Sequence, residues 1–155
     1  MVGIIGTGVI AETHLKAYLA LSDRCQMAAL CDIFPEKAQS LKEKYGLDAA
    51  EVYGDYNEML KRPDIDLVSV CTPPFTHLPV SIACMRAGKH VLVENPMALS
   101  LAECDEMIEV QKETGTYLGV VCQNRFTKDN QILKKSIRIY EIDGPFASGQ
   151  GQSFV

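Results

Sequence analysis

The sequence predicts an α/β fold that is built on a doubly wound parallel sheet. Two observations support this prediction: apolar runs of strand length alternate with segments of helical length, and the alternation continues through residues 1–125. Strands that are separated by helices run parallel, because each right-handed crossover returns the chain to the same end of the sheet. Six apolar runs therefore predict six strands, and the expected strand order is 3-2-1-4-5-6.

The individual elements follow from apolar runs and from helix start and stop signals. Pro35 suits the first turn of a helix, and Gly46 and Gly88 suit helix ends. Asp55 and Ser100 each open a capping box. Strands are expected at 2–5, 26–31, 52–53, 66–71, 91–93 and 117–122. Helices are expected at 11–21, 35–45, 55–62, 76–87, 100–113 and 132–139.

A glycine-rich turn, GTGVIA over residues 6–11, joins the first strand to the first helix. Such a turn exposes backbone N–H groups at the positive end of a helix dipole, where a pyrophosphate binds. Gly6 allows the tight turn, Gly8 allows the phosphates to approach the backbone, and Ala11 keeps the helix close to the sheet. The alternative is an ordinary strand-to-helix turn, because a glycine pattern alone does not specify a ligand.

Asp32 follows the second strand and favours the nucleotide interpretation. In dinucleotide-binding folds of the Rossmann type, an acidic residue near this spacing binds a ribose 2′-hydroxyl. A carboxylate there also repels a 2′-phosphate, and the next residues, 33–35 (IFP), include no arginine that could accept one. The sequence therefore predicts NAD as the cofactor and makes NADP the less favoured choice. The alternative is that Asp32 is a solvated strand end or a helix cap.

Ligands of doubly wound sheets bind outside the carboxyl ends of the strands. Beyond the glycine turn and Asp32, this rule selects three segments: 72–77, 94–96 and 123–125. They contain most of the unusual residues of this chain: a Pro-Pro pair, a histidine, Glu-Asn-Pro and Asn-Arg. We therefore expect these segments to form one cleft.

Composition restricts the class of partner and the location. The formal net charge of -5 argues against nucleic acid or an anionic membrane as the main partner. The apolar stretches are shorter than the roughly 20 residues that span a bilayer, and the chain starts with a strand, so we expect a cytoplasmic protein. The six cysteines lack CxxC spacing and a neighbouring histidine cluster, so no metal site is predicted.

These motifs together resemble those of the Gfo/Idh/MocA oxidoreductases. The resemblance rests on GxGxxA at 6–11, Asp32, CTPPxxH at 71–77, AGKHVxxExPMA at 87–98 and QNRF at 123–126. It implies an NAD(P)-dependent dehydrogenase of sugars, cyclitols or related alcohols, with at least a dimer as its assembly. In such proteins a Rossmann domain precedes an antiparallel-sheet domain, which supplies the substrate pocket, an acid–base histidine and the dimer surface.

The resemblance predicts how the chain divides. Residues 1–125 are expected to form the Rossmann domain, and residues 126–155 the linking helix and first strand of a truncated second domain. We accordingly expect an N-terminal fragment that is also clipped before Val2 and is inactive alone. The link is expected at 144–150. Phe146, Phe154 and Val155 are expected to form an apolar tail that is disordered, swapped or paired with an edge strand.

Asn95 departs from the family motif Glu-Lys-Pro, whose lysine helps to move the proton of the substrate hydroxyl. An amide can orient a hydroxyl or a carbonyl, but it cannot take up a proton at neutral pH. Either the chemistry is impaired or unusual, or another group, such as a histidine of the absent domain, carries the proton. A dehydrogenase is the first hypothesis, and an NAD-binding regulator that has lost catalysis is the second.

The candidate site residues follow from position and resemblance. Asn95 is the candidate catalytic position, and the resemblance implies a cis Asn95–Pro96 bond and a nicotinamide ribose or amide contact for Glu94. His77 is expected either to contact the cofactor or to pack at a helix start, and His14 is interpreted as structural. The residues expected to bind the cofactor are Gly6, Thr7, Gly8, Val9, Ile10, Asp32, Cys71, Thr72, Pro73, Pro74, His77, Glu94, Asn95 and Asn124.

Overall fold

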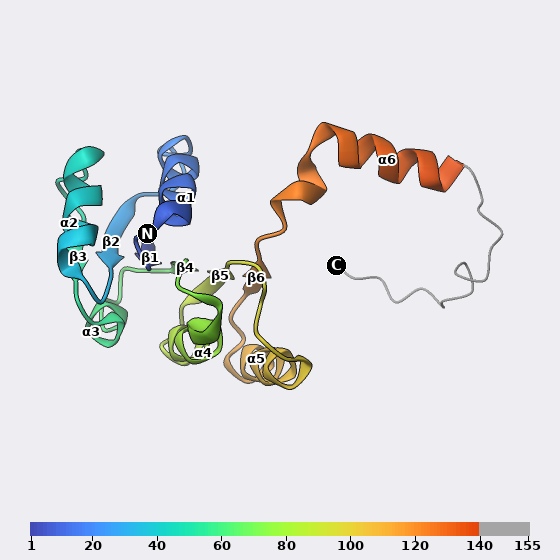
Figure 1. Cartoon of the computed structure of the whole chain (residues 1–155). Helices are drawn as coiled ribbons and strands as arrows, with labels where there is room; N and C mark the ends of the chain where they lie inside the picture. The colour runs from blue at the N-terminus through green and yellow to red at the C-terminus, as the bar shows by residue number, and fades with distance from the viewer. Residues whose placement is uncertain (140–155) are drawn as a thin grey trace. The chain divides into compact units, whose positions relative to one another are not determined.

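The computed structural model describes residues 1–139, which fall into two compact units (Figure 1). The first unit is Met1–Val121, and the second begins at Cys122. The link predicted at 144–150 lies outside the described residues, and so does the apolar tail predicted from Phe146, Phe154 and Val155.

The first unit contains a parallel sheet whose strand order, among the described residues, is β3-β2-β1-β4-β5-β6. Each neighbouring pair is parallel. The predicted strand order is therefore confirmed, including the switch point between β1 and β4. The strands are β1 (Val2–Ile5), β2 (Met27–Cys31), β3 (Glu51–Tyr53), β4 (Leu67–Val70), β5 (His90–Val93) and β6 (Leu118–Val120).

The predicted helices are all present, with shifted ends. The first helix begins at Val9, two residues before its predicted start, because the helical backbone follows directly from the N-cap Gly8. The helices of the first unit are α1 (Val9–Leu19), α2 (Pro35–Lys44), α3 (Tyr56–Leu60), α4 (His77–Arg86) and α5 (Leu101–Thr114), with a 3-10 turn at Pro74–Thr76. The second unit has a 3-10 turn at Gln123–Phe126 and α6 (Lys128–Ile139).

The two predicted capping boxes form only in part. Asp55 accepts a hydrogen bond from the Asn57 backbone N–H, but the Glu58 carboxylate pairs with the Lys61 side chain. Ser100 accepts from the N–H of Glu103 in the expected way. The Glu103 carboxylate reaches back one residue further than predicted and accepts from the N–H of Leu99, 2.8 Å away.

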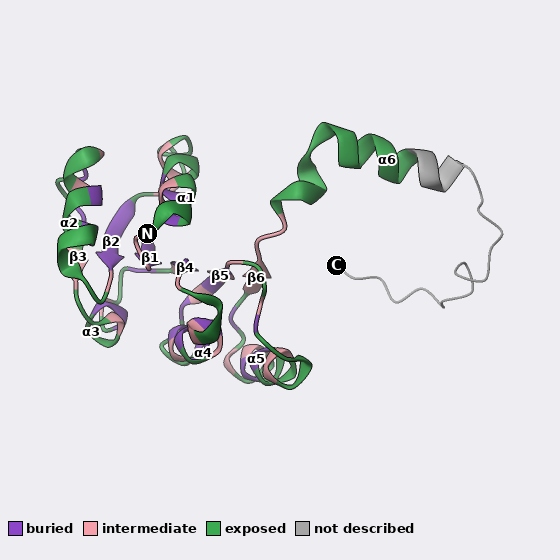
Figure 2. Cartoon of the chain, viewed as in Figure 1, coloured by how far each residue is buried: buried purple, intermediate pink, exposed green. Residues whose placement is uncertain are grey.

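Helices cover both faces of the sheet in the first unit. Figure 1 shows α1 and α2 on one face and α3, α4 and α5 on the other. The inner strands β1 and β2 are buried along their whole length, as expected for strands covered on both faces (Figure 2). Leu15 packs in the cluster on the first face, and Met59, Met85 and Met107 pack in the cluster on the second. The sheet is thereby anchored between two apolar layers.

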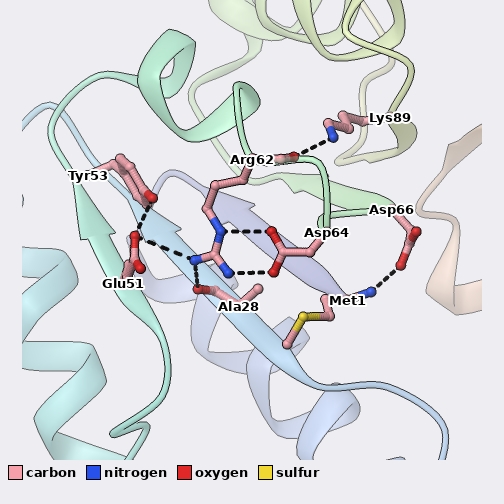
Figure 3. A network of polar contacts seen from close by, with 8 residues as sticks. All are labelled: Met1, Ala28, Glu51, Tyr53, Arg62, Asp64, Asp66 and Lys89. Carbon is pink, nitrogen blue, oxygen red and sulfur yellow. Dashed lines mark hydrogen bonds and ion pairs between the residues drawn. The ribbon is translucent and has the colours of Figure 1, made fainter.

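A polar network centred on Arg62 lies near the amino ends of the strands (Figure 3). The Arg62 guanidinium donates two hydrogen bonds to Asp64, at 3.0 and 2.6 Å, and one to the Ala28 carbonyl oxygen at 2.8 Å. Glu51 lies 3.6 Å from the same guanidinium. Hydrogen bonding to Asp64 raises the pKa of Arg62, and the reciprocal bond lowers the pKa of Asp64. This network joins the turn before β4 to β2 and β3.

Lys89 extends this network toward β5. Its buried ammonium group donates a hydrogen bond to the Arg62 carbonyl oxygen, 2.6 Å away (Figure 3). The N-terminal amine of Met1 pairs with Asp66, which precedes β4. The amino ends of five neighbouring strands, β3, β2, β1, β4 and β5, are therefore connected by polar contacts.

Candidate functional site

The glycine turn after β1 packs directly against the end of β4. Gly6 has a φ of +85°, and a Cβ at this position would lie 2.7 Å from the Cys71 carbonyl oxygen. Both the backbone conformation and the lack of space therefore require glycine. The Gly6 N–H donates to the Cys31 carbonyl oxygen at 2.8 Å, and the Cys71 N–H donates to that of Ile5 at 2.8 Å. The turn is thus held between the carboxyl ends of β2 and β4.

Gly8 has a different environment from Gly6. Its φ is -71°, which any residue can adopt, and a Cβ there would meet no described atom within 4 Å. The packing of the described residues therefore does not require glycine at this position. Gly8 is also the N-cap of α1, so no side chain caps the first N–H groups of this helix. These N–H groups and the open space beside Gly8 suit an anion that approaches the backbone.

Asp32 is held beside the glycine turn by three hydrogen bonds. The Thr7 backbone N–H and the Thr7 hydroxyl each donate to Asp32 Oδ2 at 2.8 Å, and the Phe34 N–H donates to Oδ1 at 3.0 Å. Burial favours the neutral acid, but these three hydrogen bonds and the charge of Lys37 outweigh it and lower the pKa of Asp32. The side chain is therefore an oriented, ionised acceptor.

A cavity of about 550 Å³ opens over the glycine turn and Asp32. Its volume lies in the range of ordinary ligand pockets, about 300–1,000 Å³. Of the residues predicted to bind a cofactor, the structure brings these together in its lining: Gly6, Gly8, Val9, Ile10, Asp32, Cys71, Thr72 and Pro73. The side-chain oxygen of Thr72 is buried and has no hydrogen-bond partner among the described residues, so it can accept or donate one to a ligand.

The cavity also includes residues outside the predicted cofactor-binding set, and two of them, Phe75 and Thr76, lie in the segment 72–77 that was expected in the cleft. Ile33, Phe34 and Phe75 are large apolar side chains that remain exposed at its edge. Lys37 lies with its ammonium nitrogen 4.5 Å from the centre of the Phe34 ring, a cation–π contact. The sequence offers one signal for these residues, which is their position next to predicted site residues. Ile33 and Phe34 directly follow Asp32, and Phe75 directly follows Pro74. Also in the lining are Ile5, Cys31, Gly54, Tyr56, Thr76 and Val80.

Two cysteines of the cavity lining, Cys31 and Cys71, are unreactive thiols at neutral pH. Burial raises the pKa of Cys31 to about 12, and the charge of Asp32 acts in the same direction. Burial raises the pKa of Cys71 to about 12 as well. Since the thiolate is the nucleophile and the metal ligand, neither residue supplies such a group at neutral pH. No cluster of three or more potential metal ligands is found in the described residues.

Two histidines contact the loop that follows β5, which contains Glu94, Asn95 and Pro96. His77 is almost fully buried, and its Nδ1 lies 2.7 Å from the Pro96 carbonyl oxygen. His14 Nε2 lies 2.7 Å from Glu94 Oε1. The Asn95 backbone N–H donates to the other Glu94 oxygen, 3.1 Å away. The Asn95–Pro96 bond is cis, as the resemblance implied.

Not every predicted site residue lines the cavity. Thr7 acts through Asp32. Pro74 begins the 3-10 turn after β4, His77 begins α4, and Glu94 and Asn95 follow β5, but none of these four residues is part of the lining. Asn124 belongs to the second unit, where its carbonyl oxygen accepts from Asn130 Nδ2 at 2.7 Å. The expected cofactor contacts of these residues remain predictions.

Comparison with known families identifies the chain. The model of a family described as "Oxidoreductase family, NAD-binding Rossmann fold" matches residues 1–121. The chain belongs to the Gfo/Idh/MocA oxidoreductases. The resemblance noted in the sequence is thereby confirmed. Residues 1–121 are also the first compact unit of the structure.

Curated proteins of this family that are similar to the chain include dehydrogenases. The chain is 34% identical to a myo-inositol 2-dehydrogenase of Thermotoga maritima over 144 residues, which cover 93% of this chain and 42% of the relative. It is 33% identical to a D-glucoside 3-dehydrogenase of Escherichia coli over 136 residues, 88% of this chain and 38% of the relative. The chain therefore spans about two fifths of the length of these relatives.

A solved structure supports the same assignment. The WlbA dehydrogenase from Bordetella pertussis, in complex with NADH and UDP-GlcNAcA, superposes with a TM-score of 0.83 at 31% identity. The match covers 89% of this chain and 42% of that chain. In residues 1–139, no helix is both long and apolar enough to cross a membrane.

Proposed function

We propose that this chain is the NAD-binding domain of a dehydrogenase that acts on a sugar, a cyclitol or a related alcohol. The observation that carries the proposal is one cavity that contains both the uncapped start of α1 and the oriented Asp32 carboxylate. The first feature suits a pyrophosphate and the second a ribose hydroxyl. The curated relatives support the dehydrogenase class.

Each part of the cavity suits one part of a dinucleotide. The pyrophosphate lies over Gly6 and Gly8, where the N–H groups of Val9 and Ile10 face it. A carboxylate offers about four acceptor positions, and Asp32 uses three of them within the protein, so one remains for a ribose hydroxyl. The exposed apolar residues at the edge provide a surface for a flat base.

The charge of Asp32 favours NAD over NADP. The lowered pKa keeps this carboxylate ionised at neutral pH, so a 2′-phosphate placed beside it is repelled. Lys37 is the nearby cation in the cavity lining, but its ammonium group already contacts the Phe34 ring. We therefore infer that NAD is the natural cofactor.

The chain's own contribution to the reaction centres on the loop after β5. When NAD is bound, it supplies the acceptor for a hydride from an alcohol carbon. The side-chain amide of Asn95 orients the substrate oxygen by hydrogen bonding. Because an amide takes up no proton at neutral pH, another group accepts the proton of the substrate hydroxyl. We propose that this group lies in a substrate domain, because the relatives are more than twice as long as this chain. The whole protein is then a cytoplasmic oligomer, at least a dimer.

A calorimetric titration of the chain tests the cofactor assignment. We expect saturable binding of NAD⁺, weaker binding of NADP⁺, and a reduced preference for NAD⁺ in Asp32→Ala. Asp105→Ala is the matched control, because this aspartate lies on α5, outside the cavity lining. Absence of saturable binding to the folded chain would overturn the proposal.

Asn95 stands where the family motif has a lysine, and this difference also supports a second candidate function. In that case the protein is a regulator that binds NAD but has lost the dehydrogenase reaction. The two candidates differ in the behaviour of the full-length protein, assayed for NAD⁺ reduction with a panel of polyols and sugars. A dehydrogenase turns over at least one of them, whereas a regulator binds NAD⁺ without turnover. Asn95→Lys restores a proton acceptor, and continued inactivity of that variant would favour the regulator.

A further inference from the structure

Two buried histidines contact the segment Glu94–Pro96 from different helices. His14 comes from α1, the helix that starts at the glycine turn, and His77 is the first residue of α4. His14 reaches the first residue of the segment and His77 reaches the last. The proposed function gives neither histidine a task, although both lie at the carboxyl end of the sheet.

The contact at Glu94 belongs to a chain of buried and half-buried polar groups. His14 is 8% exposed, and the Glu94 side chain is 13% exposed. His14 Nε2 lies 2.7 Å from Glu94 Oε1, and its Nδ1 lies 3.2 Å from the Ser69 hydroxyl. That hydroxyl lies 2.6 Å from the hydroxyl of Tyr18. The orientation of the His14 ring is therefore fixed on both sides.

Glu94 connects the His14 ring to the backbone of Asn95. One carboxylate oxygen accepts from His14 and the other accepts from the Asn95 backbone N–H. A rotation of the Glu94 side chain would break both hydrogen bonds at once. His14 thus limits where the Asn95 backbone can lie.

The contact at Pro96 has a similar effect from the other end. His77 is 1% exposed, and its two ring nitrogens lie 2.7 Å from the Pro96 carbonyl oxygen and 2.8 Å from that of Thr72. Carbonyl oxygens only accept, so the imidazolium donates both hydrogen bonds and the neutral ring donates one. His77 therefore ties the loop after β5 to the loop after β4.

We propose that His14 and His77 are positioning residues that hold Asn95 against the nicotinamide half of the cofactor. This inference rests on the proposed function. The cavity over β1, β2 and β4 takes the phosphates and the ribose beside Asp32. A dinucleotide crosses the switch point between β1 and β4. Its other half therefore extends toward the loops after β4 and β5. His77 joins these two loops, and His14 contacts the second of them at Glu94.

A comparison of the affinities for two ligands distinguishes this positioning role from a general effect of the histidines on the stability of the fold. ADP-ribose contains the pyrophosphate and both riboses, and NAD⁺ differs from it by the nicotinamide ring. In His14→Leu and in His77→Leu, we expect the affinity for NAD⁺ to fall about tenfold, while the affinity for ADP-ribose stays within twofold of the original protein. His14→Gln keeps an N–H donor, so it should recover part of the loss.

His90→Leu is the matched control for these variants. His90 begins β5 at the opposite end of the same strand, where its Nδ1 accepts from the Tyr117 N–H. We expect this change to leave the ratio of the two affinities unaltered. A parallel loss of NAD⁺ and ADP-ribose in the His14 and His77 variants would overturn the proposal, and so would unchanged affinities.

A second measurement needs no ligand and no leucine variant. Hydrogen exchange followed by NMR should show the Asn95 N–H protected in the original chain, and its exchange about tenfold faster in His14→Gln but not in His90→Gln. An equal exchange rate in His14→Gln and the original chain would overturn the positioning role. If the original chain binds neither ADP-ribose nor NAD⁺, the proposed function fails, and the exchange result still decides whether His14 positions Asn95.

Discussion

Thr7 holds the carboxylate of Asp32 through two hydrogen bonds to the same oxygen. The backbone N–H and the hydroxyl of Thr7 both lie 2.8 Å from Asp32 Oδ2. This pair connects the glycine turn after β1 to the loop after β2, 25 residues further along the chain. The two groups assigned to the pyrophosphate and to the ribose are therefore placed relative to each other by one residue.

Removal of the Thr7 hydroxyl should weaken cofactor binding. Thr7→Val keeps the side-chain shape but loses one donor to Asp32, so we expect the affinity for NAD⁺ to fall about fivefold, as a net hydrogen-bond contribution of about 1 kcal/mol implies. Thr7→Ser retains the hydroxyl and serves as the control. Calorimetric titration of both variants checks this, and equal affinities in the two would contradict it.

The ionisation of Asp32 should make its contribution to stability depend on pH. Its pKa is lowered in the folded chain, so the stabilisation is present above the unfolded value of about 4 and is lost as the pH falls through the folded pKa. The difference in unfolding free energy between the original chain and Asp32→Asn should therefore be largest above about pH 5 and shrink in acid. Urea unfolding between pH 3 and pH 7 measures it, and a difference that grows in acid would have the wrong sign.

Alanine substitutions at the two glycines of the turn should affect different properties: Gly6→Ala should lower stability, and Gly8→Ala should lower NAD⁺ affinity. Gly6→Ala forces a side chain into a positive φ and against the Cys71 carbonyl oxygen, so we expect a loss of about 3 kcal/mol in unfolding free energy. Gly8→Ala meets open space, so stability should change by less than about 1 kcal/mol while NAD⁺ affinity falls at least about tenfold. Thermal unfolding and titration separate the two effects. Retained NAD⁺ affinity in Gly8→Ala would argue against phosphates at this position.

Arg62 should contribute more to stability than an exposed cation. Arg62→Met removes the donors to Asp64 and to the Ala28 carbonyl oxygen, so we expect a loss of about 2 kcal/mol. Lys112→Met removes an exposed pair with Glu109 and should cost less than about 0.5 kcal/mol. Urea unfolding at neutral pH compares the two variants. Similar losses would mean that the network adds little beyond a surface ion pair.

The fold and part of the site could be predicted because their signals are local. The glycine turn, Asp32 and the apolar runs each lie within a few consecutive residues, and the right-handed crossover rule converts the runs into a strand order. Helix ends were less accurate: α1 starts at Val9 because backbone geometry at Gly8 sets the boundary. Glu58 pairs with Lys61, a neighbour that competes with the predicted capping contact.

The remaining features of the site depend on contacts between distant residues. His14 and Glu94 are 80 residues apart, and nothing in either local sequence indicates that one binds the other. The sequence places His14 on the first helix and predicts a structural role, but it indicates no partner for this residue. Ile33 resembles an ordinary loop residue in the sequence, and only the packed structure shows that it borders the same cavity as Phe75, which lies in the predicted segment 72–77.

The position of the Arg62 network has a consequence for how such a chain can change. Its hydrogen bonds join strands near their amino ends, whereas Gly8, Asp32 and Asn95 follow strands at their carboxyl ends. Substitutions that alter what the protein recognises therefore fall on loops that the Arg62 contacts do not involve. Residues in the loops at the carboxyl ends of the strands can therefore be substituted, by design or by natural variation, while the contacts at the amino ends maintain the order of the strands.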